Sequence, residues 1–463
     1  MSVRWEWVER GGMGSLFRMT RCVATFWLGV SYIANAFLKV PLIDDLNVVL
    51  MAAVVVLSLV ASTGSSRMIG AVLLSLGIAV LVYAHAPLDV WKQALQENAY
   101  LIVMFIMIPL LGIPVQHGGY SDSLREVFVR YAHTNTRYYA VVSGMAALIG
   151  VLLSIAAVPL TYEVSRASGR SENKKLLSTA LSRGFTTCMI WAPTSATIAL
   201  VVQVTGVDWV AFFPFALACA VVAEAVGVLM ADKRPSQAVD EPVGEFDLRK
   251  GMELCVFGFL LIALVMVVSR FGGLSIMLVV AMASLVCPVV WMTLIGRFPT
   301  YVREFRDEYV KKKLPQVKNQ IVLFAGAGLF AQSIGYSHGG DALAGVLLQL
   351  AGQNVVVLTI VIVGITLATS AVGVHPIVVI AVVGGALSAA ECGVTPIYLA
   401  LVFSISWAMG NALCPASANV IAVADMVGQS PVKVGLRWNG PYVLVATTVL
   451  VAGLAFARMA GLF

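Results

Sequence analysis

Charged side chains are scarce in this sequence. Asp, Glu, Lys and Arg make up only 12% of its 463 residues, whereas 60% are hydrophobic and the mean hydropathy is +0.92. A soluble globular domain carries about 25% charged residues, so this composition indicates lipid as the solvent. Apolar stretches of about 17–25 residues recur along the chain without period-two alternation, which favours spanning helices over a β-barrel. The sequence therefore predicts an all-α polytopic membrane protein.

Metal-ligand clusters and nucleotide-binding motifs are missing as well. The chain has five His and seven isolated Cys, with no CxxC pair and no Gly-rich loop ending in Gly-Lys-Ser or Gly-Lys-Thr. These absences exclude a zinc centre, a disulfide framework and a nucleotide-driven pump, and they disfavour a membrane-embedded enzyme. The net charge of +6 comes from basic residues between apolar runs, which does not indicate nucleic-acid binding. We expect no enzymatic activity and no cofactor other than a coupling ion.

The apolar runs divide into spans and interrupted segments. Two stretches, 138–165 and 354–388, carry central interruptions and are predicted to be re-entrant helical hairpins. About eleven transmembrane helices are predicted, with boundaries good to a few residues, at 22–40, 46–63, 68–86, 97–114, 178–204, 207–231, 251–269, 273–296, 319–337, 396–426 and 438–461.

Basic residues set the predicted orientation. If 138–165 is re-entrant, the Lys and Arg residues of 125–137, 166–183, 233–250 and 297–318 all fall on one side. The positive-inside rule then gives a cytoplasmic N-terminus, and we expect the bacterial inner (cytoplasmic) membrane. The segments 121–134 and 297–318 look like amphipathic surface helices. The predicted domains are N-terminal scaffold helices 1–96, repeat 1 at 97–231, a cytoplasmic linker 232–250, scaffold helices with a basic segment at 251–318, and inverted repeat 2 at 319–463.

The two predicted repeats contain the same structural elements in the same order. Each has a span, a short amphipathic piece, an interrupted hairpin, a broken span and a closing span. The broken spans read "WAPTSAT" at 191–197 and "LCPASAN" at 413–419. With the predicted topology the copies are inverted, and matched broken helices in an inverted repeat are typical of a secondary transporter's substrate site at the midplane. The alternative is that Gly, Pro, Ser and Ala merely permit close helix packing.

The broken helices suggest a chemistry. Pro193 and Pro415 remove backbone amides, so freed carbonyls could coordinate Na⁺, while the half-helix that follows presents free amides to an anion. Hydroxyl, amide and imidazole groups near the breaks and hairpin tips complete the predicted substrate site, namely Ser154, Thr194, Ser195, Thr197, Ser370, His375, Ser417 and Asn419. The predicted Na⁺ site lies near Ser154, Thr187, Ser370 and Asn411.

Two ionisable residues are candidates for proton coupling. His375 precedes Pro376 at a hairpin tip, and Glu224 lies in the middle of a span. The alternatives are a structural histidine and a helix-seam contact. Arg183, at the start of the first broken span, is expected to snorkel toward the interface.

The pattern resembles the ion transporter superfamily, and most closely its divalent anion/sodium symporter branch. That family has two inverted repeats with a re-entrant hairpin and an unwound helix in each. Its hairpin tips read Ser-Asn-Thr, where this chain has Ser154-Ile155-Ala156 and Ser370-Ala371-Val372. The resemblance implies an elevator-type motion and a homodimer.

The expected function is secondary active transport of a small organic anion of the carboxylate type, coupled to Na⁺ or H⁺. The alternative within the same superfamily is a proton-coupled efflux antiporter for an oxyanion or a drug-like acid. A channel would need a continuous polar lining, whereas the polar residues here gather near the midplane.

Overall fold

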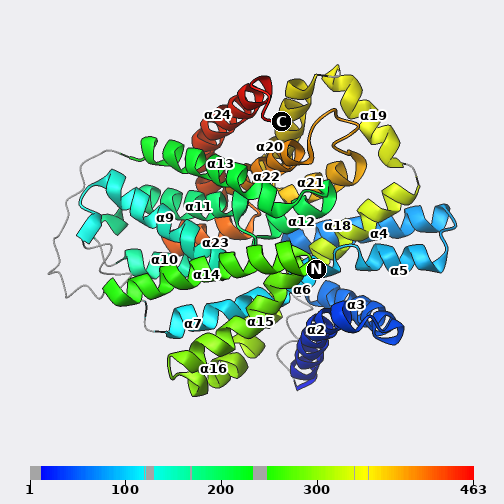
Figure 1. Ribbon diagram of the computed structural model, residues 1–463, viewed down its shortest axis with the longest axis horizontal. Helices are drawn as coiled ribbons and strands as arrows, with labels where there is room; N and C mark the ends of the chain where they lie inside the picture. The colour runs from blue at the N-terminus through cyan, green and yellow to red at the C-terminus, as the bar shows by residue number, and fades with distance from the viewer. Residues whose placement is uncertain are drawn as a thin grey trace. The chain divides into compact units, whose positions relative to one another are not determined.

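The computed structural model describes residues 12–118, 120, 130–166, 169–232, 248–337, 339–352 and 354–463 (Figure 1). Over these residues it is helical and contains no strand. Ten of its helices are long and apolar enough to cross a membrane, or eleven if the bent pair Ala344–Ala351 and Val355–Ala371 counts as one span. The predicted fold class, an all-α polytopic membrane protein, is confirmed.

The described residues form two compact units. Unit 1 comprises Met1–Pro114 and Met277–His338, and unit 2 comprises Val115–Ile276 and Gly339–Phe463. The spans predicted to open each repeat, 97–114 and 319–337, belong to unit 1. The remaining elements of both repeats lie in unit 2.

Unit 1 is built from five long helices and several short ones. The long helices are α2 (Gly12–Leu38), α3 (Pro41–Ala61), α4 (Gly64–Tyr83), α15 (Ile276–Leu294) and α18 (Lys318–Tyr336). The short ones are α5 (Leu88–Gln96), α6 (Ala99–Met107), η1 (Ile108–Leu111), α16 (Phe298–Glu304), η4 (Phe305–Lys313) and α17 (Leu314–Gln316), with α7 (Gly112–His117) at the boundary to unit 2.

Helices α4 and α18 approach each other closely because both carry glycines at the contact. A Cβ atom on Gly326 would lie 2.9 Å from the Gly70 carbonyl oxygen. Next to this contact, the Asn98 amide donates a hydrogen bond of 2.9 Å to the Phe324 carbonyl. Small residues and polar side chains of this kind hold membrane helices together without a hydrophobic driving force.

The segment 297–318 is helical and has two different faces. On one face Tyr309 is buried and donates a 2.7 Å hydrogen bond to the Ile106 carbonyl. On the other, Lys311 pairs with Asp307 at 2.7 Å. The Arg306 guanidinium and the Lys311 ammonium hold the pKa of Asp307 at about 2. The predicted amphipathic helix is therefore present, whereas most of the other one, 121–134, lies outside the described residues.

Unit 2 contains the interrupted segments. Its elements are α9 (Asn135–Leu153), η2 (Ser154–Ala156), α10 (Ala157–Ser165), η3 (Gly169–Glu172), α11 (Lys174–Trp191), α12 (Ala196–Thr205), α13 (Trp209–Leu229), α14 (Leu248–Gly272), α19 (Gly339–Ala351), α20 (Val355–Ala371), α21 (Pro376–Ala386), α22 (Pro396–Leu413), α23 (Ala418–Val427), η5 (Lys433–Asn439) and α24 (Gly440–Met459). Residues 233–247 of the predicted linker lie outside the described part of the chain.

The first predicted hairpin doubles back on itself. The Tyr138 hydroxyl, near the start of α9, donates to the Ser165 carbonyl at the end of α10 over 3.4 Å. A continuous helix would separate these residues by about 40 Å at 1.5 Å per residue. The reversal occurs at Ser154, whose φ of 51° and ψ of −134° are unusual for a residue with a side chain.

The second predicted hairpin is also two helices, and α21 packs against both α20 and α19. Gly373, with a φ of 95°, makes the turn between α20 and α21 possible.

Candidate functional site

The two broken helices of unit 2 share one design. Each consists of an 18-residue helix, a four-residue break and a 10-residue helix. Each also ends on a left-handed glycine, Gly206 with a φ of 65° and Gly428 with a φ of 62°. The breaks, 192–195 and 414–417, carry the prolines that the sequence pattern singled out.

Hydrogen bonds through the two breaks correspond pair by pair. The amide of Ser195 donates to the Ala192 carbonyl at 2.9 Å, and the amide of Ser417 donates to the Cys414 carbonyl at 3.1 Å. Both serine hydroxyls then cap the following half-helix: Ser195 Oγ accepts from an amide of α12 and Ser417 Oγ from an amide of α23, each at 3.2 Å. The two breaks therefore have the same local hydrogen-bond geometry.

The broken helices pack crosswise. Helix α12 lies against α22, and α11 lies against α23 (Figure 1). The first half of each broken helix thus contacts the second half of the other. This pairing is expected when the two run in opposite directions, as in an inverted repeat.

Each hairpin tip lies against the break of its own repeat. In repeat 1 the Thr194 hydroxyl donates to the Val151 carbonyl over 2.5 Å. In repeat 2 a Cβ on Gly410 would lie 2.8 Å from Ser370 Oγ and 2.9 Å from the Pro376 ring. The glycine therefore permits the tip to approach the helix immediately before the break.

Four of the predicted substrate residues are engaged in holding the structure. Thr194 joins hairpin and break, while Ser195 and Ser417 cap helices. His375 caps α21, because its Nδ1 accepts a 3.2 Å hydrogen bond from the Ile377 amide. Only Nε2 of that imidazole remains for a ligand, and the ring stands edge-on to Trp407 at 6.1 Å.

Other predicted residues carry buried oxygens without a hydrogen-bond partner among the described residues. A buried polar group left unpaired costs about 1–3 kcal/mol, so such groups are rare unless water or a ligand completes them. Four of them lie at the breaks or at the second hairpin tip, namely Thr197 Oγ1, Ser370 Oγ, Asn411 Oδ1 and Asn419 Oδ1.

The orientation of the Asn419 amide is fixed by its nitrogen. Nδ2 donates to the Ser182 carbonyl at 3.1 Å, to the Ser182 hydroxyl at 3.1 Å and to the Thr186 hydroxyl at 3.4 Å. Because a carbonyl only accepts, the nitrogen must face Ser182 and the oxygen must face away. Asn419 therefore offers an acceptor to a cation or to a donor group of the substrate, and its donors are not free for an anion.

Backbone carbonyls freed by the second break already have close neighbours. The Asn411 carbonyl accepts from Ser417 Oγ at 2.8 Å, and the Ala412 carbonyl accepts from Asn439 Nδ2 at 3.1 Å. At the first break, the Trp191 carbonyl accepts from the Trp209 indole at 3.2 Å. Side-chain oxygens are thus better candidates than these carbonyls for a Na⁺ ion.

The residues of the predicted Na⁺ site fall into different places. Ser370 lies against Gly410, the neighbour of Asn411, so these two belong to one locality. Thr187 lies near the Glu224 carboxylate and donates to the Gly184 carbonyl at 2.8 Å. Ser154 forms the tip of the first hairpin, and its side chain is half-buried.

Arg183 does not snorkel, so that prediction is wrong. Its side chain is only 4% exposed and lies above the Tyr442 ring at 4.6 Å. It is also the charged group that faces Glu224. Glu224 accepts a hydrogen bond from Ser143 through Oε1, while its buried Oε2 has no partner in the described structure. The Arg183 side chain can be buried because protein groups replace the water molecules that a snorkelling guanidinium would contact at the membrane interface.

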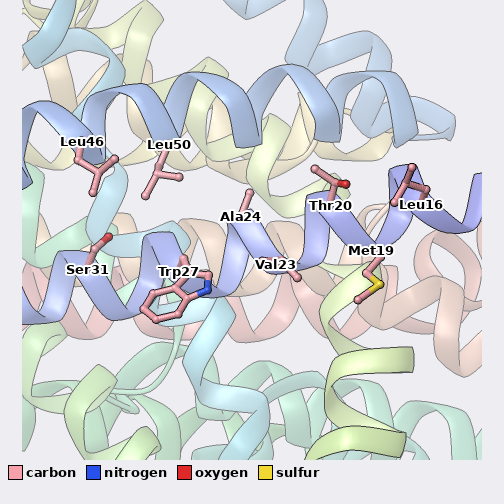
Figure 2. Close-up of a pocket in the computed structure, with 9 residues that line it drawn as sticks. All are labelled: Leu16, Met19, Thr20, Val23, Ala24, Trp27, Ser31, Leu46 and Leu50. Carbon is pink, nitrogen blue, oxygen red and sulfur yellow. The ribbon is translucent and has the colours of Figure 1, made fainter.

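A separate groove of about 540 Å³ lies in unit 1, between α2 and α3 (Figure 2). Its lining is almost entirely apolar and includes none of the predicted site residues: Leu16, Met19, Thr20, Val23, Ala24, Trp27, Ser31, Leu46 and Leu50. No group of three or more His, Cys, Asp or Glu side chains that could hold a metal ion occurs in the described part of either unit.

No known family model matches this sequence, and no curated protein resembles it closely enough to be matched. Solved structures do match. The YdaH transporter of Alcanivorax borkumensis, whose crystal structure was described as having an unusual topology, is 16% identical with a TM-score of 0.54, over 81% of this chain and 89% of that one. MtrF of Neisseria gonorrhoeae, described within a class of antimetabolite efflux pumps, is 15% identical with a TM-score of 0.49, over 80% of this chain and 85% of that one.

At these identities the likeness concerns the fold alone, and the overlap with MtrF is too weak to argue from. The chain therefore shares the fold of the YdaH transporter. The predicted likeness to divalent anion/sodium symporters gains no support from these comparisons.

Proposed function

We propose that the chain is a secondary transporter of a small organic anion, driven by Na⁺ or H⁺, with its substrate site at the two breaks of unit 2. The observation that carries this proposal is the set of buried, unpartnered oxygens at the breaks. The hydroxyls of Thr197 and Ser370 can donate to an anion, whereas the amide oxygens of Asn411 and Asn419 only accept and suit a coupling cation or a donor group of the solute. Buried polar groups of this kind are normally completed by water or by a ligand. The shared fold with the YdaH transporter supports the same class of function.

Anion binding is supported by the two half-helices that follow the breaks. Helices α12 and α23 begin at Ala196 and Ala418 inside unit 2, and the first turn of a helix has amides without intrahelical partners. These amides and the helix dipole favour a negative group.

Ion coupling has two candidate locations. Asn411 Oδ1 and Ser370 Oγ are hard oxygen ligands of the kind that Na⁺ prefers, and Ser370 lies against Gly410, the residue before Asn411. Glu224 Oε2 is buried and unpartnered, so it could carry a proton. His375 is the weaker proton carrier, because protonating Nδ1 would break the cap of α21.

The test is solute flux in proteoliposomes containing the purified protein. Imposed Na⁺ and H⁺ gradients, each applied alone, are combined with a panel of radiolabelled carboxylates, sulfonates and drug-like acids. We expect one gradient to drive accumulation of at least one small anion. Accumulation driven by an outward H⁺ gradient, from an acidic lumen, would assign the proton-coupled antiporter instead. Flux of no solute under either gradient would refute secondary anion transport.

A further inference from the structure

Arg183 lies at the centre of a buried network that extends to the second break. Its Nε donates to Asn439 Oδ1 at 3.2 Å, and its Nη2 donates to the Trp438 carbonyl at 2.8 Å. Asn439 is fully buried and closes the short helix η5. The guanidinium therefore holds the oxygen of the Asn439 amide, which accepts its hydrogen bond.

Asn439 in turn donates hydrogen bonds to residues at the second break and in α11. Its Nδ2 donates to the Ala412 carbonyl at 3.1 Å and to the Ser182 hydroxyl at 3.0 Å. Helix α22 ends at Leu413, so the Ala412 carbonyl has lost its partner in the next turn. The Asn439 amide replaces that partner.

The same network reaches the free oxygen of Asn419. Ser182 receives hydrogen bonds from both Asn439 and Asn419. Asn419 turns its nitrogen toward Ser182, and its oxygen consequently faces away from the network. Arg183 is thus connected through two side chains to an atom of the proposed ligand site.

Arg183 has an ionisable neighbour and two aromatic neighbours within unit 2. Glu224 faces the guanidinium, and the ring of Tyr442 lies 4.6 Å from its Cζ. The Tyr139 ring lies on the guanidinium as well, at 5.9 Å. A buried guanidinium with these partners is a fixed structural charge, in contrast to the mobile side chain expected of a snorkelling arginine.

We propose that Arg183 is a positioning residue: acting through Asn439, which donates to the Ala412 carbonyl and to the Ser182 hydroxyl, it holds the second break in one conformation beside the proposed ligand site. The ligand in this statement rests on the proposed function. The positioning itself can be measured without any ligand.

The experiment uses the native cysteines at the breaks as reporters. Cys414 is buried in the second break, and Cys188 is buried one turn before the first. Two single-cysteine proteins, one retaining Cys414 and one retaining Cys188, are labelled with N-ethylmaleimide in the absence of substrate. We expect Arg183→Met to raise the labelling rate of Cys414 by on the order of tenfold, because Asn439 loses its donor and no longer holds the Ala412 carbonyl at the break as firmly. Cys188 should keep its rate.

Matched variants separate positioning from general damage. Arg458 also donates to a carbonyl, that of Gly393 at 3.1 Å, and also lies over a tyrosine ring, that of Tyr398 at 5.8 Å, but neither partner belongs to the network of Asn439 and Ser182. Arg458→Met should leave Cys414 labelling unchanged. Arg183→Lys keeps the charge but cannot reproduce both hydrogen bonds, and should give an intermediate rate. Asn439→Ala should raise the labelling rate of Cys414 as Arg183→Met does. It replaces Arg183→Met in the comparison if the Arg183 variant does not fold.

Unchanged Cys414 labelling in both Arg183→Met and Asn439→Ala would overturn the proposal, as would an equal rise at Cys188. A wild type that moves no anion but shows the expected labelling pattern would refute the proposed function and leave the positioning role intact.

Discussion

At the residue scale, Ser195 and Thr197 illustrate how neighbours in one motif differ. The Ser195 hydroxyl accepts the Thr197 amide and so caps a helix, whereas the Thr197 hydroxyl is buried without a partner in the described structure. Both are small hydroxyl residues of "WAPTSAT", so the motif alone could not separate them. The distinction depends on which atoms tertiary packing has already paired.

Ser417 is expected to contribute to stability. Its hydroxyl caps α23 and donates to the Asn411 carbonyl across the break. Ser417→Ala should lower the stability of the folded protein by about 1–2 kcal/mol, seen as a lower thermal unfolding temperature in detergent. Ser370→Ala, which removes a hydroxyl with no partner, should not lower it. Equal unfolding temperatures for Ser417→Ala and wild type would contradict the capping role.

Thr197 is expected to contribute to transport and little to stability. Thr197→Val keeps the shape and removes the unpartnered hydroxyl, so transport should fall by about tenfold with no loss of thermal stability. Thr366→Val is the matched control, because Thr366 is equally buried and its hydroxyl bonds only to its own helix, at 2.8 Å. Unchanged flux in Thr197→Val would remove this residue from the site.

At the element scale, close contacts between helices depend on single glycines. A Cβ at Gly410 would meet Ser370 and Pro376 at the second hairpin tip, whereas one at Gly364 in α20 would meet nothing within 4 Å. Gly410→Ala should therefore destabilise the protein by about 1–3 kcal/mol and slow transport, while Gly364→Ala should be neutral or stabilising. Thermal unfolding and initial flux of the two variants provide the comparison. Equal behaviour would show that the tip does not need this contact.

Hairpins and broken helices could be predicted because proline, glycine and serine interrupt apolar runs where the helices end. Pro193 and Pro415 both fall inside the observed breaks, and the turn at Ser154 lies inside the predicted interruption. Helix ends are local properties of the chain, which explains this agreement. The role of Arg183 could not be predicted, because its partner Asn439 lies 256 residues away and the hydrogen bond exists only in the folded protein.

At the scale of the whole molecule, the order of the elements along the chain could be predicted from the sequence. Their distribution between the two compact units could not. The spans that open the two repeats pack in unit 1, where Asn98 and the glycines of α4 and α18 bring helices together. Hydropathy identifies a span but does not reveal which neighbour it packs against. The fold class could be predicted because the composition indicates that lipid surrounds the helices. The packing partners of each helix could not be predicted, because composition does not show which helices contact one another.

The central claim is that solute binds at the two breaks of unit 2, and flux through variants of that site tests it most directly. Proteoliposomes containing wild type, Ser370→Ala, Asn411→Leu or Thr366→Val are compared at equal protein density under the same ion gradient. The account predicts gradient-driven flux of a small anion in wild type and Thr366→Val, and a loss of about tenfold or more in Ser370→Ala and Asn411→Leu. Full flux in both site variants would contradict it.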